Sequence, residues 1–377
     1  MNDLNKSSTT FSDSKSHYQI LDGLRGVASI MVICFHVLET FSEADHTKQI
    51  INHGYLAVDF FFLLSGYVIG YAYDDRWGKM SLTDFFKRRL IRLQPMIIMG
   101  SIVGAIFFYF GASPTLFPKI SQTPLWQVIL TMLIGATLIP LPKTMDIRGW
   151  DEMHPLNGPA WSLFFEYVAN ILYALFIRKF SNTMLSILVF LAGCFLIHLA
   201  VTSPKGDVIG GWSLDAAQLH VGFARLLYPF FAGLLLSRIT KPRQINNAFM
   251  WSSLLIIAVL AFPRVGGSEW WLNGVYDAFS IIVLFPLAVY IGASGTIKNK
   301  MVSKISTFLG DISYPLYITH YPVIYVYTAW AINNKISLRD GLPYGVLVVI
   351  VSITIAYLSL KLYDIPVRKW LSEKFVK

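Results

Sequence analysis

Arg25 and His36 lie in one apolar stretch near the start of the chain, LRGVASIMVICFHV, which is predicted to form a membrane-spanning helix. Eleven helical steps of about 100° end within ~20° of three full turns, so the two side chains share one face about 16 Å apart. Asp22 and Glu39 bracket them at i−3 and i+3. Ionisable groups are costly in a bilayer, and an imidazole beside carboxylates suits general-base chemistry. The alternative is a headgroup contact for Arg25 and a merely buried His36.

A second basic cluster follows in KRRLIRLQP, where Arg88, Arg89 and Arg92 fall within little more than one helical turn. Arg88 and Arg92 stack at i, i+4 and form a fork that suits a phosphate. A positive-inside stop signal that contacts anionic lipids explains the same cluster equally well.

The apolar segment GYLAVDFFFLLSGYVIGYAY (54–73) contains a carboxylate and a face of small residues. Asp59 needs a partner or water at this depth, so we expect it to be functional. Ser65 and Gly66 lie on a small face that permits close approach of another helix, and packing is the simpler role for the glycine.

Another ionisable side chain follows a proline at the start of the segment GPAWSLFFEYVANILY (158–173). Ser162 and Glu166 are i, i+4 and share a face, with Trp161 beside them. A Glu inside a span needs a cation or a water-filled cavity, and Arg225 in LHVGFARLLYPFFAGLLL is the obvious intramembrane cation. A purely structural Glu166–Arg225 pair is therefore an open alternative to a role in substrate binding.

The last polar group occurs in LGDISYPLYITHYP (309–322), where Tyr317 and His320 are i, i+3. Pro315 and Pro322 predict a broken helix that lines a cavity. An aromatic belt at the membrane interface explains the tyrosines as well, but not the histidine.

Composition excludes an ordinary soluble domain. The 377 residues are 55% hydrophobic and only 14% charged, which is typical of a polytopic membrane protein. The net charge of +9 is better explained by loop asymmetry than by nucleic-acid binding. No histidine pair has metal spacing, and no GxxxxGK[ST], GxGxxG or GxSxG motif occurs. We therefore expect no metal site and no nucleotide hydrolase.

The chain is predicted to be all-α, with about ten transmembrane helices and both termini cytoplasmic. The expected spans are 24–39, 54–73, 94–112, 160–178, 184–202, 219–238, 249–263, 272–293, 308–330 and 343–363. If the further apolar run 124–142 also crossed, Lys and Arg would divide evenly between the two sides, so we assign it as re-entrant or surface-lying. Residues 1–19 are predicted to be a disordered cytoplasmic tail without a signal peptide, 20–363 the membrane domain and 364–377 a second cytoplasmic tail.

In these residues the chain resembles the acyltransferase family 3 integral-membrane proteins, which include bacterial O-antigen and exopolysaccharide O-acetylases. The resemblance runs nearly end to end. It rests on five ordered motifs: LDGLRG…FH with Arg25 and His36, VDFFFLLSGY (58–67), FKRRLIRLQP (86–95), AWSLFFE (160–166) and LGDISYPLYITH (309–320). One departure is DIPVR (364–368), where many relatives have Glu before the proline.

The resemblance implies transfer of an acetyl group from cytoplasmic acetyl-CoA to a hydroxyl of a carbohydrate or lipid-linked glycan. It also implies a multi-pass protein of the cytoplasmic (inner) membrane. The expected catalytic residues are His36, Arg25, Glu166 and Glu39. The expected donor-binding residues are Arg25, Arg88, Arg89, Arg92, Ser65 and Gly66. The expected acceptor-binding residues are Trp161, Ser162, Asp59, Tyr317 and His320.

The spacing of Arg25 and His36 predicts how the reaction is laid out. A pantetheine arm is comparable in length to the ~16 Å between them, so phosphates held at the cytoplasmic mouth would place the thioester at His36. Both side chains should then line a single passage, with Glu39 or Glu166 orienting the imidazole. The rival class is a transporter or flippase with an intramembrane ion path, which explains isolated charges but not the ordered motifs.

Overall fold

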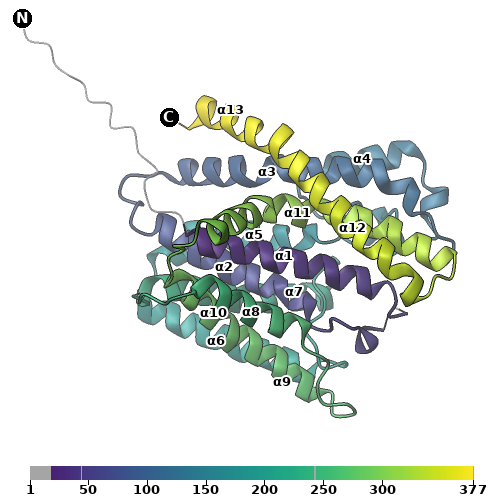
Figure 1. The fold of residues 1–377 in the computed structure, drawn as a ribbon. Helices are drawn as coiled ribbons and strands as arrows, with labels where there is room; N and C mark the ends of the chain where they lie inside the picture. Colours follow the sequence, from purple (N-terminus) through teal and green to yellow (C-terminus); the bar gives the residue numbers. More distant parts are fainter. Residues whose placement is uncertain (1–17, 44, 242, 377) are drawn as a thin grey trace, which may run out of the picture.

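The computed structural model describes residues 18–43, 45–241 and 243–376, and these residues form helices and loops without a named strand (Figure 1). Residues 1–17 of the predicted N-terminal tail lie outside the described residues, and α1 already begins at Gln19. The predicted all-helical class is confirmed for the described part of the chain.

The helices carry the labels used in Figure 1. In chain order they are α1 (Gln19–Glu39), α2 (Ala57–Tyr73), α3 (Leu82–Phe107), α4 (Leu125–Gly135), α5 (Ala160–Leu175), α6 (Asn182–Thr202), α7 (Ala216–Ile239), α8 (Ala248–Ala261), α9 (Trp271–Phe279), α10 (Phe285–Ala293), α11 (Lys300–Asn333), α12 (Leu338–Ser359) and α13 (Ile365–Phe375). One π-helical turn (Ser280–Leu284) joins α9 to α10, and another (Leu360–Asp364) joins α12 to α13.

Each of the ten predicted spans falls on a helix or on a joined pair of helices. Among the described residues, 7 helices are long and apolar enough to cross a membrane, which supports a polytopic membrane protein. The apolar helices α5 and α8 are shorter, and α11 is the longest at 34 residues. Helix α4 has only 11 residues, about 16 Å of helix, which is roughly half the thickness of a hydrocarbon core.

Two pairs of helices form the centre of the bundle, with α1 packed along α11 and α2 along α7 (Figure 1). Small residues set these close approaches. A Cβ on Gly66 would lie 1.9 Å from the Phe230 carbonyl oxygen, and one on Gly26 would lie 2.2 Å from that of Leu309. The contact of Gly66 with α7 agrees with the packing role considered from the sequence.

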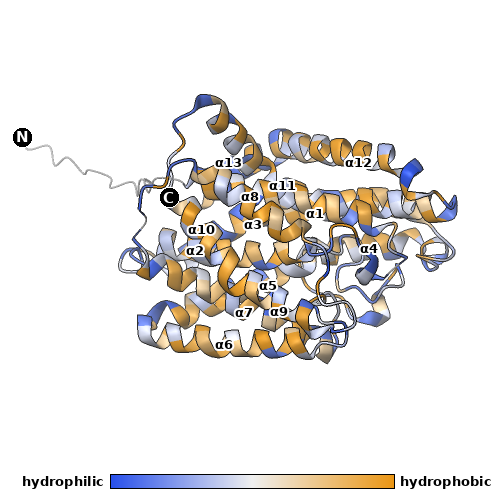
Figure 2. Ribbon diagram, turned by 60° about the horizontal axis from the view of Figure 1, so that its bottom comes forward, coloured by the Kyte–Doolittle hydropathy of each residue, from blue (hydrophilic) through white to orange (hydrophobic). Residues whose placement is uncertain are grey.

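The outer helices present apolar side chains away from the bundle. Figure 2 shows α6 and α12 as mainly hydrophobic along their lengths. On α6 the exposed side chains include Ile187, Phe190 and Leu191, and on α12 they include Leu347 and Ile350. Such a surface suits hydrocarbon and not water.

Helix α11 is continuous from Lys300 to Asn333, so the prediction of a broken helix is wrong. Pro322 cannot donate to the carbonyl of Ile318, which would leave that oxygen unsatisfied. The side chain of Asn157 replaces the missing donor with a hydrogen bond of 2.8 Å to the same oxygen. A loop residue far away in sequence therefore allows the helix to continue through its proline.

The C-terminal segment is also more ordered than the predicted tail. After the π-helical turn, α13 continues from α12 and packs against α3. The start of α1 and the end of α13 lie toward the same end of the bundle (Figure 1). This arrangement places Asp364 and Arg368 next to the basic residues of α3.

Candidate functional site

Two cavities follow one another along α1. The face of this helix that carries Arg25 and His36 lines both of them. The first, called the Arg25 cavity, has a volume of about 440 Å³ and is also lined by Ser65, Arg89 and Glu166. The second, called the His36 cavity, has a volume of about 650 Å³ and is also lined by Glu39 and Trp161.

The two cavities meet at Tyr317. Of the residues that the structure describes, only Val58 and Tyr317 line both of them. The Tyr317 hydroxyl lies 2.8 Å from the Ser162 hydroxyl and 3.3 Å from the Pro159 carbonyl oxygen, and its ring packs edge-on against Phe61. The expected single passage is therefore divided, with Arg25 on one side of the Tyr317 side chain and His36 on the other.

His36 is paired with a carboxylate of its own helix. Its Nδ1 lies 2.7 Å from a carboxylate oxygen of Glu39, one helical turn along α1. A carboxylate oxygen accepts from an imidazole N–H, so this contact holds the His36 ring in one orientation. The ring also packs edge-on against Tyr321, with centroids 4.6 Å apart, and stacks against His320 at 5.7 Å. Glu39 is thus the carboxylate that orients His36, whereas Glu166 lines the other cavity.

The Arg25 cavity combines paired and unpaired guanidinium groups. The Arg89 Nη2 lies 2.8 Å from Glu166 Oε1, which also accepts from the Ser65 hydroxyl at 2.8 Å. Arg25 Nη1 lies 3.3 Å from Asp22, the helical neighbour expected from the sequence. Arg92 is exposed into the cavity with no hydrogen bond or ion pair to the described residues. A bound anion can therefore reach Arg92 without breaking an existing pair.

Glu166 and Arg225 do not pair, so that alternative from the sequence is wrong. Arg225 binds Asp59 instead, with Nη2 2.6 Å and Nε 3.2 Å from the carboxylate, and both side chains are buried. Arg225 also donates to the carbonyl oxygens of Tyr55 and Gly210. The guanidinium carbon of Arg225 lies 5.3 Å from the centroid of the Trp161 ring. The pair fixes one wall of the His36 cavity.

Four of the expected site residues do not line either cavity. Asp59 is completely buried behind Arg225, and Gly66 lies in the contact between α2 and α7. Arg88 directly precedes Arg89 on α3 but is not among the residues that line the Arg25 cavity. His320 is buried, and its Nδ1 lies near the carbonyl oxygens of Leu316 and Tyr317, one turn back on α11. Asp59 contacts the cavity lining through Arg225, and His320 contacts it through the rings of His36, Tyr317 and Tyr321.

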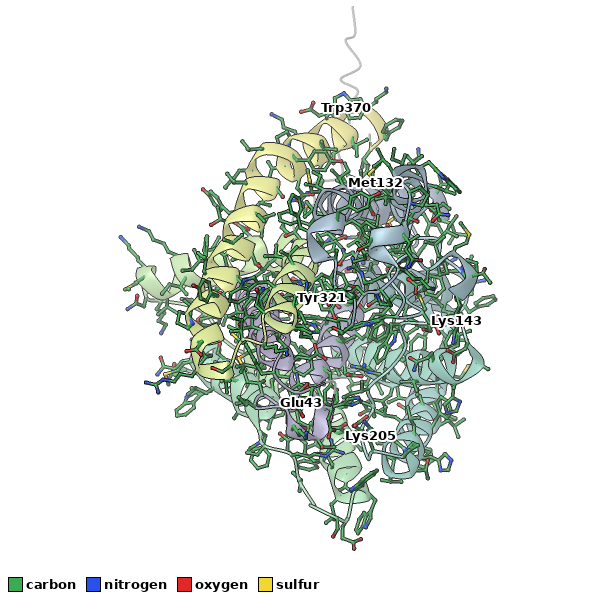
Figure 3. The ribbon with its side chains drawn as sticks, turned by 90° about the vertical axis from the view of Figure 1, so that its right-hand side faces the viewer. Glu43, Met132, Lys143, Lys205, Tyr321 and Trp370 are labelled. Carbon is green, nitrogen blue, oxygen red and sulfur yellow. The ribbon has the colours of Figure 1, made fainter. Side chains whose placement is uncertain are left out.

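Glu152, Tyr321 and Arg368 are among the cavity residues that sequence analysis missed. Glu152 and Tyr321 line the His36 cavity, and Arg368 lines the Arg25 cavity. Figure 3, which looks onto the end of the bundle at Glu43, shows Tyr321 near its middle and Lys143 toward its edge. Tyr321 directly follows His320, and Arg368 follows Asp364 at i+4 with an ion pair of 2.7 Å, so both had a local signal. Glu152 had none, because a single carboxylate in a polar loop normally faces water.

The described residues contain no group of three His, Cys, Asp or Glu side chains placed to hold a metal ion. The two cavities present a positioned imidazole on one side of the Tyr317 side chain and arginine side chains on the other. Such a pair of compartments suits transfer of a group between an anionic donor and an acceptor that gives up a proton.

Comparisons with known proteins agree with this chemistry. A family model described as an acyltransferase domain matches residues 18–361. O-acetyltransferase OatA of Staphylococcus aureus strain NCTC 8325 is 25% identical over 365 residues, which cover 93% of this chain. A putative O-acetyltransferase, SACOL0978, of Staphylococcus aureus strain COL is 24% identical over 372 residues. The chain spans only 57% of the length of these relatives. No solved structure matches it significantly.

Proposed function

The chain belongs to the acyltransferase domain family, and on that premise we propose that it moves an acetyl group from acetyl-CoA to a hydroxyl of a carbohydrate acceptor. The observation that carries the proposal is the His36–Glu39 pair in a cavity that adjoins an arginine-lined cavity across one tyrosine. The names of the relatives as O-acetyltransferases support the choice of acetyl as the group transferred.

The donor binds in the Arg25 cavity. The unpaired guanidinium of Arg92 binds a donor phosphate, and Arg25 and Arg89 add positive charge beside it. Arg25 and His36 are eleven residues apart on α1, about 16 Å along the helix, which suits the pantetheine arm. The phosphates then remain in the first cavity while the thioester extends toward the second. A cytoplasmic acetyl-CoA donor requires the Arg25 cavity to open to the cytoplasmic side of the cell membrane.

The acceptor binds in the His36 cavity, whose walls include Trp150, Trp161 and Trp212. Aromatic faces bind the apolar faces of sugar rings while hydroxyl groups bind polar side chains. The acceptor is a glycan unit or a lipid-linked glycan that enters from the outer side.

His36 removes the proton of the acceptor hydroxyl as its oxygen attacks the thioester carbonyl carbon. The proton passes to Nε2, the new ester C–O bond forms, and the C–S bond breaks to release the CoA thiolate. Glu39 stabilises the imidazolium that forms, because its carboxylate already holds Nδ1. The imidazolium then returns the proton to the departing sulfur or to water.

The reaction requires the Tyr317 side chain to move. Its hydroxyl is held by Ser162 and by the Pro159 carbonyl, both near the start of α5. Because Val58 and Tyr317 are the shared lining, rotation of Tyr317 joins the two cavities. Its return closes the path to water after transfer.

Radiolabelled acetyl-CoA and a panel of glycosides, supplied to the purified protein in lipid nanodiscs, test the proposal. The wild-type protein should label a glycoside and release CoA in equal amounts. His36→Ala should abolish both, while His198→Ala, a matched change at an exposed position on α6, should leave them intact. Acetyl transfer at the wild-type rate by the His36→Ala protein contradicts the assignment.

A further inference from the structure

Glu152 lies in the loop between α4 and α5 and is only 5% exposed, although it lines the His36 cavity. The backbone on its C-terminal side is held in two places. The Met153 N–H donates to the Trp212 carbonyl, and the Met153 carbonyl accepts from the Leu141 N–H. A loop carboxylate is therefore kept at a fixed position in the cavity wall.

The carboxylate of Glu152 has more acceptor capacity than the protein uses. Among the described residues its one hydrogen-bond donor is the Tyr325 hydroxyl, 2.9 Å from Oε1 and 2.7 Å from Oε2. A single hydroxyl proton serves one oxygen at a time, whereas an ionised carboxylate accepts about four hydrogen bonds. The Gly158 N–H donates to the Tyr325 oxygen at 3.2 Å, which directs the hydroxyl proton toward Glu152. The remaining lone pairs of the carboxylate can accept hydrogen bonds from a ligand.

The nearest cation does not neutralise this carboxylate by a direct contact. The Arg148 guanidinium lies 3.5 Å from the centroid of the Tyr325 ring, and its Nε donates to the Pro155 carbonyl at 2.9 Å. Burial raises the pKa of Glu152 to about 7, and the nearby Arg148 charge opposes that rise only in part. Burial therefore disfavours the charged form of Glu152, and hydrogen bonds from the hydroxyl groups of a ligand would stabilise that form.

Glu152 and His36 line the same cavity, and the Tyr321 side chain lies between them. The Tyr321 ring contacts the His36 ring at 4.6 Å and the Tyr325 ring at 4.5 Å. A ligand that spans Tyr321 can therefore reach Glu152 at one end and the catalytic imidazole at the other.

We propose that Glu152 is an acceptor-binding residue that selects for a vicinal diol. Its two carboxylate oxygens accept from two neighbouring hydroxyl groups of a sugar, and this contact presents another hydroxyl of the same acceptor to His36. The inference rests on the proposed function for the identity of the reaction, but the binding step itself does not need a donor.

Binding without acetyl-CoA is the first test, since three tryptophans line the cavity and report occupancy by their fluorescence. The probes are methyl hexopyranosides and their monodeoxy analogues, which lack one hydroxyl of a diol. Hydrogen bonds to a charged group correspond to about tenfold or more in affinity. The wild-type protein should bind the best diol about tenfold more tightly than its deoxy analogue, and Glu152→Gln should lose most of that ratio. Glu43→Gln is the matched control, because Glu43 lines the same cavity but is exposed and paired with Lys48.

Acetyl transfer with the same probes is the second test. Glu152→Gln should raise the acceptor KM for diols and leave kcat within a few-fold, because a Gln oxygen still accepts from Tyr325. Should Glu152→Gln fail to fold, Glu152→Asp is the alternative variant. It retains the charge on a shorter side chain, and it should lower the ratio of diol affinity to deoxy-analogue affinity. An unchanged diol-to-deoxy ratio in either variant, or no such ratio in the wild-type protein, overturns the inference. Loss of all acetyl transfer by the wild-type protein, with diol-selective binding intact, counts instead against the proposed function.

Discussion

Removal of the Asp59 carboxylate should destabilise the protein far more than removal of an exposed carboxylate. Asp59 is 0% exposed and Arg225 2% exposed, so neither charge has water to replace its partner. In Asp59→Asn the buried guanidinium keeps its charge but loses the opposite charge, and the amide offers it one accepting oxygen in place of two. Truncating one member of a buried pair costs about 3–5 kcal/mol. The two remaining carbonyl partners of Arg225 do not compensate, because they are neutral.

The exposed Glu43–Lys48 pair provides the comparison. Its side chains are 78% and 57% exposed, and exposed pairs contribute about 0.2–1 kcal/mol. Unfolding by denaturant in mixed micelles should therefore show Glu43→Gln close to wild type and Asp59→Asn several kcal/mol less stable. The double variant Asp59→Leu with Arg225→Met should recover part of the loss, since no isolated charge then stays buried. Equal stability of Asp59→Asn and Glu43→Gln would refute the argument that the buried pair holds this wall of the cavity.

Further predictions concern the two cavities and the barrier between them. Arg92→Ala should raise the KM for acetyl-CoA by about 10-fold or more, as expected for a lost phosphate contact, whereas Arg88→Ala should not, because Arg88 lies outside the cavity lining. Steady-state kinetics with varied acetyl-CoA decides this, and an equal rise in both variants counts against the phosphate role of Arg92. Ser162→Ala removes the hydrogen bond that holds Tyr317, worth about 0.5–1.5 kcal/mol, so acetyl-CoA hydrolysis without acceptor should rise about 2- to 10-fold. No increase in CoA release would mean that this bond does not hold the barrier closed. Burial raises the pKa of Glu152 from its ordinary value of 4.5 to about 7 in the folded protein, so the folded protein holds more of this proton than the unfolded chain between these pH values. The free energy of unfolding of the wild-type protein, relative to that of Glu152→Gln, should therefore fall by on the order of 3 kcal/mol as pH rises from about 4.5 to 7. Denaturant titrations measure this, and a difference between the two proteins that does not change with pH would contradict the burial of this carboxylate.

Much of the fold was predictable because apolar run length and helical period act locally. All ten predicted spans coincide with helices, and the family identified from five short motifs is confirmed by the match over residues 18–361. The helical period also placed Arg25 and His36 on one face of α1, but each lines a cavity of its own and not the single passage that we expected. The continuity of α11 did not, because Asn157, which satisfies the Ile318 carbonyl, is distant in sequence.

The sequence did not predict which buried charged side chains pair with each other. Glu166 and Arg225 both required an opposite charge, and pairing them was chemically reasonable. The structure satisfies each with another residue, Arg89 for Glu166 and Asp59 for Arg225. Which pairs form depends on the rotation and depth of four helices, and no local pattern encodes these. The same limit applies to Glu152, whose burial depends on how a loop folds over the cavity.

The division of the passage at Tyr317 has a physical consequence for the proposed reaction. A channel open at both ends would let water and ions follow the thioester between compartments, so some side chain has to close it. Val58 is β-branched and stiff at χ1, whereas Tyr317 turns about two torsions and is held by its hydroxyl. Breaking one or two such hydrogen bonds costs about 1–3 kcal/mol. That cost leaves the barrier closed most of the time, yet it is small beside the barrier to acyl transfer itself, so thermal opening can admit the thioester before each turnover.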